Sequence, residues 1–212
     1  MLYIISTPIG NLKDITLRAL ETLETIDYLL CEDTRVTGNL LKLLGIKNRP
    51  QLISFYDEIE LQKIPQVIKL LEDGGEVGLV TDAGTPLISD PGWLLLQKCQ
   101  KLGIKYTCLP GACAAINAAV LSGLPIQRFS FLGFLPRNSG DRKKILESYK
   151  NVSTVKIVYE APGRLIKTIE DIKTVYGSDT QIKIIREMTK KFEEILTPDQ
   201  INNLKGEAVI VF

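Results

Sequence analysis

The sequence predicts an α/β protein of two domains, an N-terminal parallel sheet wound with helices on both faces and a C-terminal mixed sheet. Short apolar runs alternate with segments of helical periodicity through the first half of the chain, and short connections join them. In the second half the last apolar runs follow one another with little helix between them, which indicates antiparallel pairing. The 212 residues are 45% hydrophobic and 24% charged, which excludes a disordered chain.

In the first half, strands are expected at the apolar runs 2–5, 28–31, 52–54, 77–81 and 104–109. The helix after the first strand is expected to be capped by Asp14 and to carry Leu17, Leu20 and Leu23 on one face. Further helices are expected through 40–44, around 64–71 and over 93–102.

In the second half, a helix of small residues is expected over 114–121, with later helices around 142–149 and 164–175. Strands are expected at 129–132, 155–159, 182–185, 193–196 and 208–211. The change of pattern places a boundary near 111–115 and gives domains 1–112 and 113–212. Because no linker separates them, we expect the two halves to pack together with a cleft between them.

The sequence contains no histidine, which excludes Ser-His-Asp triads, Cys-His dyads and histidine-ligated zinc. The four cysteines lack C-x-x-C spacing and lie in or beside apolar runs, so we expect reduced thiols and no metal site. We also expect a soluble cytoplasmic protein, because no signal peptide and no apolar stretch of the ~20 residues that span a membrane is present. The net charge of +1 leaves nucleic-acid binding to local patches.

Polar segments rich in Gly and Pro follow four of the expected strands, at 7–11, 32–35, 82–92 and 110–112. Ligands bind beyond the carboxyl ends of the strands in an open parallel sheet, so these segments predict a small-molecule site. Ordinary turns use the same residue types, and a purely structural role is therefore the alternative. No segment matches G-x-G-x-x-G or the P-loop pattern, which favours a ligand without a pyrophosphate.

These segments closely resemble one group of proteins, the ribosomal RNA small subunit methyltransferase I group of the tetrapyrrole methylase-like superfamily. In chain order the matching segments are TPIGNL (7–12), DITLRAL (14–20), EDTR (32–35), DAGTPLISDPG (82–92), GLP (123–125), GFLPR (133–137), REMTK (186–190), FEE (192–194) and KGE (205–207). They span essentially the whole chain, and the run from Asp82 is the most specific.

The resemblance implies S-adenosylmethionine-dependent 2′-O-methylation of a cytidine ribose in the decoding region of 16S rRNA, within the 30S subunit. It implies the two-domain tetrapyrrole methylase-like fold, with the cofactor in the cleft between the domains, and a homodimer. The cofactor-binding residues that it carries over are Pro8, Gly10, Asp82, Gly84, Thr85, Pro86, Ile88, Ser89, Pro110, Gly111 and Ala112. From the second domain it adds Phe131, Tyr159 and Ala208.

Such a reaction requires a ribose hydroxyl to be aligned with the methyl carbon and its proton to be removed. Without histidine, the candidate bases are Glu32, Asp33, Asp82, Glu160, Glu187 and Lys190. We expect the catalytic loop to be Glu32, Asp33 and Arg35, with one carboxylate accepting the proton while Arg35 holds a phosphate. A salt bridge between Asp33 and Arg35 that only shapes the loop is the alternative.

Basic residues near these loops are expected to hold RNA phosphates, while a solvated charged face is the alternative for some of them. One group, Arg137, Arg142, Lys143 and Lys144, surrounds a flexible hinge expected at 138–140; the other contains Lys183, Arg186, Lys190 and Lys191. Among loop aromatics, Phe55, Tyr56 and Phe134 are candidates for stacking on a base, with core packing as the alternative.

The sequence departs from the pattern of the group that it resembles in four places. The group usually has an aromatic followed by His-Glu-His-Asn after Ser54, whereas residues 55–60 contain no histidine. Ala112-Cys113 replaces Pro-Ser, Ala161-Pro162-Gly163 replaces Ser-Pro-His, and many members continue beyond the position of Phe212. Two other functions therefore stay open: a non-catalytic member that binds cofactor or ribosome, and a methyltransferase of a tetrapyrrole precursor.

Overall fold

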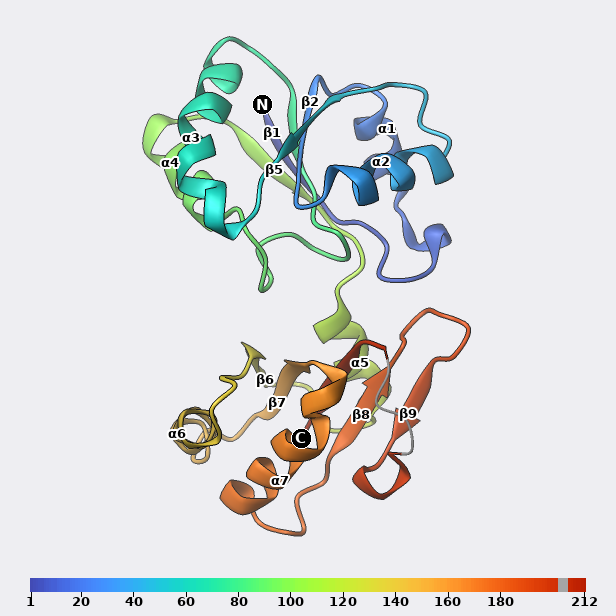
Figure 1. Cartoon of the computed structure of the whole chain (residues 1–212), viewed down its shortest axis with the longest axis vertical. Coiled ribbons are helices and arrows are strands. Elements are labelled where there is room, and N and C mark those ends of the chain that lie inside the picture. The colour runs from blue at the N-terminus through green and yellow to red at the C-terminus, as the bar shows by residue number, and fades with distance from the viewer. Residues whose placement is uncertain (202–205) are drawn as a thin grey trace. The chain divides into compact units, whose positions relative to one another are not determined.

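The structure is a computed structural model that describes residues 1–201 and 206–212. Lys205 of the KGE segment lies outside the described residues. The chain divides into two compact units, unit 1 with residues 1–113 and unit 2 with residues 114–212. Each unit is built around a sheet of its own (Figure 1).

Unit 1 contains a parallel sheet whose strand order is β3-β2-β4-β1-β5. The strands are β1 (Leu2–Ile5), β2 (Tyr28–Cys31), β3 (Gln51–Ser54), β4 (Val77–Leu79) and β5 (Tyr106–Leu109). In the centre of the sheet, Leu2 of β1 lies opposite Val77 of β4 on one side and Tyr106 of β5 on the other. The expected N-terminal parallel sheet is confirmed.

Helices cover both faces of this sheet, as predicted (Figure 1). They are α1 (Leu17–Leu23) and α2 (Thr34–Leu43) on one face, and α3 (Asp57–Glu72) and α4 (Trp93–Leu102) on the other. The alternation of side chains along β2 explains this arrangement, because Leu30 packs with α3 and α4 whereas Leu29 and Cys31 pack on the side of α1 and α2. Helices therefore bury both faces of the sheet, which explains why the sequences of its strands are continuous apolar runs.

Two helices of unit 1 begin at residues other than those expected. Thr16, not Asp14, caps α1 by accepting a hydrogen bond from the Ala19 amide, because Asp14 belongs to the preceding 3₁₀ turn η1 (Leu12–Asp14). Helix α3 begins at Asp57, well before the expected start near 64, and carries Pro65 inside it. Proline is typical of a first helical turn, whereas Pro65 lies in the middle of this helix.

Unit 2 contains a mixed sheet of strand order β6-β7-β10-β8-β9. The strands are β6 (Phe129–Phe134), β7 (Val155–Glu160), β8 (Lys183–Arg186), β9 (Glu194–Leu196) and β10 (Ala208–Val211). The β6–β7 pair is parallel, while β10 is antiparallel to both β7 and β8, and β9 is antiparallel to β8. The expected mixed sheet is confirmed.

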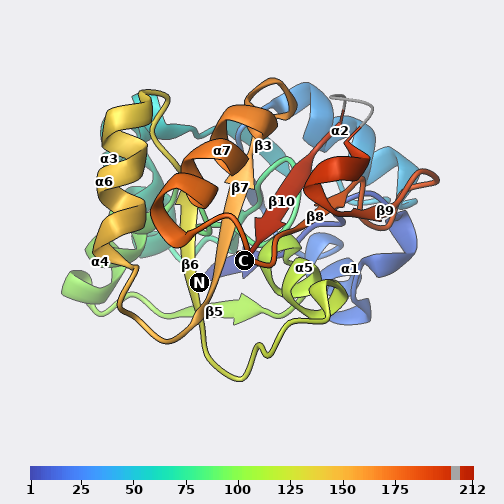
Figure 2. The same ribbon diagram turned by 90° about the horizontal axis from the view of Figure 1, so that it is seen from below.

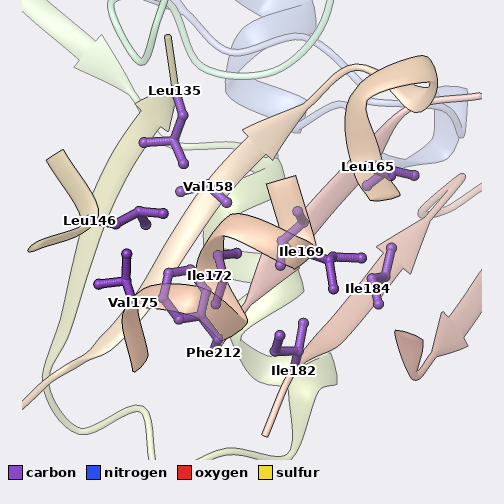
Figure 3. Packing of buried hydrophobic residues seen from close by; sticks show 12 residues of the cluster. Leu135, Leu146, Val158, Leu165, Ile169, Ile172, Val175, Ile182, Ile184 and Phe212 are labelled. Carbon is purple, nitrogen blue, oxygen red and sulfur yellow. The ribbon is translucent and has the colours of Figure 1, made fainter. Parts of the chain in front are cut away.

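The core of unit 2 lies between this sheet and its helices. These are α5 (Ala114–Ser122), α6 (Ser139–Ser148) and α7 (Leu165–Tyr176), with 3₁₀ turns η2 (Pro162–Arg164) and η3 (Pro198–Gln200). Figure 2 shows β7, β10 and β8 side by side, with α7 and α5 on either side of them. Along α7, Leu165, Ile169 and Ile172 pack against Val158 and Ile184 of the sheet (Figure 3).

The expected flexible hinge at 138–140 is a helix start instead. Asn138 caps α6 by accepting a hydrogen bond from the Asp141 amide, and Ser139 and Gly140 form the first turn of that helix. Asn is a preferred residue at helix N-caps. The polar residues that suggested a flexible hinge therefore mark the start of α6.

In the described part of the chain, the helices are all too short or too polar to cross a membrane.

The cap of α1 gives a test of the observed helix start. Thr16→Ala should lower the free energy of unfolding by about 1 kcal/mol, because the Ala19 amide loses its acceptor. Asp14→Ala is the matched control and should change it by less than about 0.5 kcal/mol. Urea unfolding followed by circular dichroism measures both, and equal losses would contradict the assignment of the cap.

Candidate functional site

The loops that follow β1, β2, β3, β4 and β5 all leave the unit 1 sheet at its carboxyl edge, because the strands are parallel. These loops contain the expected site residues of the first 112 positions except Arg35, which lies in the first turn of α2. We call this set of loops the carboxyl edge; it comprises 6–11, 32–33, 55–56, 80–92 and 110–113.

A pair of backbone hydrogen bonds joins the loop after β1 to the loop after β4. The Thr7 amide donates to the Gly84 carbonyl at 2.8 Å, and the Gly84 amide donates back to the Thr7 carbonyl at 3.1 Å. The Thr7 hydroxyl also donates to the Thr81 carbonyl at 3.2 Å. The TPIGNL and DAGTPLISDPG segments, far apart in the chain, therefore form one connected surface.

The loop after β5 is tied to the same surface by hydroxyl groups. Ser6 Oγ lies 3.0 Å from Thr85 Oγ1 and donates to the Leu109 carbonyl at 3.2 Å, while Thr85 Oγ1 donates to the Ala112 carbonyl at 2.9 Å. Gly111 fits here because a Cβ at its position would lie 2.6 Å from Ser6 Cβ. The structure thus brings the predicted residues Gly84, Thr85, Gly111 and Ala112 together.

Gly84 has a backbone conformation that other residues rarely adopt. Its φ is +89°, and a Cβ there would lie 3.3 Å from Ile9 Cγ2 and 3.7 Å from the Ala112 carbonyl oxygen. Of the other predicted cofactor residues in these loops, Pro8 and Pro86 are buried, and those that are exposed are Gly10, Asp82, Ile88, Ser89 and Pro110.

Acidic side chains lie along the carboxyl edge. Glu32 Oε1 accepts a hydrogen bond from the Asp82 amide at 3.1 Å, which links the loops after β2 and β4. Partial loss of hydration raises the pKa of Glu32, and also that of Asp82 although much of its surface is exposed, and nearby negative charges raise both pKa values further. Burial, followed by the charge of Glu32, raises the pKa of Asp90 to about 7.

Asp33 and Arg35 form an ion pair. Such a pair was expected under the alternative interpretation, in which the two residues only shape the loop. Asp33 caps α2 by accepting the Arg35 amide at 2.8 Å, and its carboxylate also accepts Arg35 Nε at 3.1 Å and Nη2 at 2.7 Å. Hydrogen bonding to the Arg35 side chain and amide holds the Asp33 pKa well below its usual value. The pair therefore has a clear structural role at the start of α2.

The expected cofactor residues of unit 2 lie on three neighbouring strands. The rings of Phe131 and Tyr159 meet edge to face with centroids 4.9 Å apart, and the Tyr159 hydroxyl accepts a hydrogen bond from the Ala115 amide at 3.1 Å. Ala208 differs, because its side chain is buried in the core cluster that includes Val158. It therefore faces away from Tyr159, and only its backbone is available on that side.

The basic residues expected to bind RNA fall into two kinds. Arg137 and Lys144 are exposed, and Lys144 pairs with Asp141 at 3.0 Å. Arg142 differs from the expectation, because its side chain is only 3% exposed and its guanidinium donates to Asp171 at 2.7 Å and to the carbonyls of Pro136 and Arg137. It is a structural residue that fixes the turn before α6.

The remaining basic residues of these groups are mostly engaged within unit 2. Arg186 is buried and pairs with Glu194 at 2.6 Å. Like Arg142, it is therefore not available to an RNA phosphate, which corrects the expectation that it binds RNA. Lys190 pairs with Glu207 at 2.8 Å and Glu187 at 3.2 Å, and half-buried Lys143 lies 3.9 Å from Asp171.

The aromatic candidates also separate once their exposure is known. Phe55 is fully buried in the core of unit 1, so its expected role in stacking is wrong. Tyr56 is 38% exposed at the start of α3, and Phe134 is 60% exposed with its ring 5.4 Å from that of Tyr159. Only the last two can meet a base.

Two of the other candidate bases are bound to cations. Glu160 is buried and accepts hydrogen bonds from the Ala161 amide, Thr168 and Arg164, while Glu187 accepts from Lys190 and the Glu207 amide. Within residues 1–201 and 206–212, no group of three His, Cys, Asp or Glu side chains could hold a metal ion.

Sequence reasoning missed three residues of the carboxyl edge. Thr81 ends an apolar run and was read as part of a strand, and Ser6 follows the first strand without being singled out, whereas the hydroxyls of both lie among the loops. Asp90 lies inside the most specific matching segment but was not singled out. Its raised pKa depends on burial by distant parts of the chain, which no local pattern reveals.

Comparison with known proteins gives matches over nearly the whole chain. The family model described as Tetrapyrrole (Corrin/Porphyrin) Methylases matches residues 1–201. A protein of Haemophilus influenzae is 45% identical over 100% of this chain and 77% of its own length, and one of Thermotoga maritima is 44% identical over 91% and 85%. One of Mycoplasmopsis pulmonis is 43% identical over 100% and 96%.

All three relatives are named ribosomal RNA small subunit methyltransferase I. Because the Mycoplasmopsis relative is matched over nearly its full length, proteins with this name need not carry the C-terminal extension that many members have.

The buried pair of Arg142 and Asp171 gives a test of the structural role of Arg142. Asp171→Ala should lower the free energy of unfolding by about 3–5 kcal/mol, because it leaves a buried guanidinium without its carboxylate. Asp141→Ala removes the exposed partner of Lys144 and should cost less than about 1 kcal/mol. Urea unfolding measures both, and similar small losses would return Arg142 to the candidate RNA contacts.

Proposed function

The chain belongs to the tetrapyrrole methylase family, and we propose that it methylates small-subunit ribosomal RNA on the 2′ hydroxyl of a decoding-region cytidine. The methyl donor in this proposal is S-adenosylmethionine. An assembled 30S particle as substrate and a homodimer as the working form belong to the same proposal.

The observation that carries the proposal is the folding of the DAGTPLISDPG segment. This segment is bonded to the loops after β1 and β5 through Thr7, Ser6 and Ala112, so the segments that match relatives best form one surface. Relatives at 43–45% identity that carry the rRNA methyltransferase name support the substrate class.

The carboxyl edge fits the proposed donor in chemistry. S-adenosylmethionine has no phosphate and carries positive charge on its sulfonium and ammonium groups. Gly111 is exposed and carries no side chain, so its backbone can meet the donor, and Glu32 and Asp82 supply negative charge at the same sheet edge. When bound, the donor supplies an already activated methyl group.

The residues of this chain then have three tasks. The loops at Gly84, Thr85 and Gly111 bind and orient the donor through backbone groups. The acidic residues at the end of β2 and in the loop after β4 place a carboxylate near the ribose hydroxyl, where Glu32, Asp33 and Arg35 remain the proposed catalytic loop. Exposed Arg137 and Lys144 are the basic side chains best placed to meet RNA phosphates.

The deciding experiment uses labelled S-adenosylmethionine and 30S subunits that lack the modification. We expect label on one cytidine ribose of the decoding region, located by nuclease digestion and mass spectrometry. Label on a base or on another RNA would assign a different target. Donor binding without transfer to 30S subunits would favour the non-catalytic function, and transfer to a tetrapyrrole precursor would favour the small-molecule alternative.

A second test addresses the donor loops. Gly84→Ala should weaken S-adenosylmethionine binding by about tenfold or more, because a Cβ would enter the surface between Ile9 and Ala112. Gly45→Ala is the matched control: Gly45 also has positive φ, at +73°, but a Cβ there meets nothing within 4 Å. Both variants carry backbone strain of about 1 kcal/mol. Calorimetry measures binding, and equal affinities would remove this loop from the donor site.

A further inference from the structure

Four carboxylates from separate places in the chain lie at the carboxyl edge or directly beside it. Glu32 follows β2, Asp57 begins α3 after β3, and Asp82 and Asp90 lie between β4 and α4. The charges of Glu32, Asp57 and Asp82 all act on Asp90. In the part of the chain that the structure describes, none of the four forms an ion pair with a cation.

Asp90 is held in place by the backbone around it. Ser89 has φ of +71° and Gly92 has φ of +120°, and a Cβ on Gly92 would lie 2.6 Å from Leu79 of β4. Beyond the loop, buried Glu60 of α3 accepts hydrogen bonds from the amides of Leu94 and Leu95, which fixes the start of α4. The half-buried carboxylate therefore has a defined position at the edge.

The buried hydroxyl of Thr81 points to a ligand at this position. Thr81 is 2% exposed and its side chain lies beside the Asp90 carboxylate. Within the described residues, its Oγ1 makes no hydrogen bond of normal length and angle, and its weaker interaction with the Asp90 carboxylate lowers the pKa of that group. Buried polar atoms are nearly always satisfied, and a hydroxyl group of a ligand that contacts both Thr81 and Asp90 would complete the hydrogen bonding of this one.

The other carboxylates of the edge are engaged in ways that Asp90 is not. Asp33 is bound by the Arg35 side chain and amide, which hold its pKa low and make it a weak proton acceptor. Glu32 accepts the Asp82 amide and so links two loops. Burial and neighbouring negative charges give Asp90 a pKa of about 7, close to the value that suits a general base at neutral pH.

We propose that Asp90, rather than Asp33, accepts the proton of the ribose 2′ hydroxyl during methyl transfer. The proposal rests on the proposed function. The 2′ oxygen forms the new bond to the methyl carbon, the carbon–sulfur bond breaks with its electron pair going to sulfur, and the O–H proton passes to the Asp90 carboxylate. The sulfonium loses its positive charge in this step, and the Asp90 carboxylate holds the released proton. The step therefore needs no further reactant.

The first experiment measures the titration of Asp90 in the full chain without substrate. Carboxyl ¹³C NMR, with Asp90→Asn to assign the resonance, should show a midpoint near 7 for Asp90, while Asp33 stays ionised down to strongly acidic pH. The groups that face Asp90 are Glu32, Asp57, Asp82 and Thr81, so Glu32→Gln should move this midpoint to lower pH. A midpoint below 5 would overturn the proposal whatever the activity.

The second experiment measures methyl transfer to 30S subunits between pH 5.5 and 9. The parent rate should rise with pH and level off above about 7, because the base must be ionised. Asp90→Asn should lower kcat at least about 100-fold and abolish the inflection, with S-adenosylmethionine affinity unchanged within about threefold. Asp73→Asn, an exposed change at the far end of α3, is the matched control and should behave like the parent.

The outcomes separate this proposal from the function on which it rests. No transfer by the parent protein would reject the proposed function, and the NMR midpoint would still decide the state of Asp90. Transfer by Asp90→Asn at the parent rate, with the inflection retained, would reject Asp90 as the proton acceptor while leaving the function intact. Loss of the inflection in Asp33→Ala alone would return that role to Asp33.

Discussion

The two hydrogen bonds between Thr7 and Gly84 are the interaction on which the carboxyl edge depends. They join the loops after β1 and β4, which the parallel sheet brings near each other but does not itself connect. Ser6 and Thr85 then extend the connection to the loop after β5. Backbone groups make the central link, hydroxyl groups make the others, and glycine is required where the chains approach most closely.

The same edge concentrates negative charge, which opposes folding. Glu32, Asp82 and Asp90 have raised pKa values, so their ionised forms are less stable in the folded chain than in water. The folded pKa of Asp90 exceeds its unfolded value, so this penalty grows as the pH rises from about 4 to 7 and is then constant. A positively charged ligand beside Glu32 and Asp82 would offset their part of the penalty, which is an electrostatic reason for such a site to prefer a charged donor to its neutral product.

The sequence predicted the two sheets and most of their strands because buried runs such as 28–31 are apolar throughout and are bounded by polar residues. It also identified the loops of the edge, since ligand-binding loops follow parallel strands. It failed where the outcome depends on distant contacts. Nothing local distinguishes Arg142, which binds Asp171 of the neighbouring helix α7, from exposed Lys144 two positions later. Phe55 and Tyr56 are likewise adjacent aromatics, and only packing decides that the first is buried.

The absence of histidine gives the carboxyl edge its chemical importance. Histidine is the side chain that titrates near neutral pH without help, whereas a carboxylate does so only where burial and like charges raise its pKa. The edge supplies both conditions at Asp90, through the half-buried loop before α4 and through Glu32, Asp57 and Asp82. At Asp33 the neighbouring Arg35 has the opposite effect, although the two aspartates serve the same sheet edge. Two side chains of one type therefore differ in pKa because one meets a cation and the other meets anions, and a carboxylate whose pKa is raised in this way can accept a proton near neutral pH without histidine.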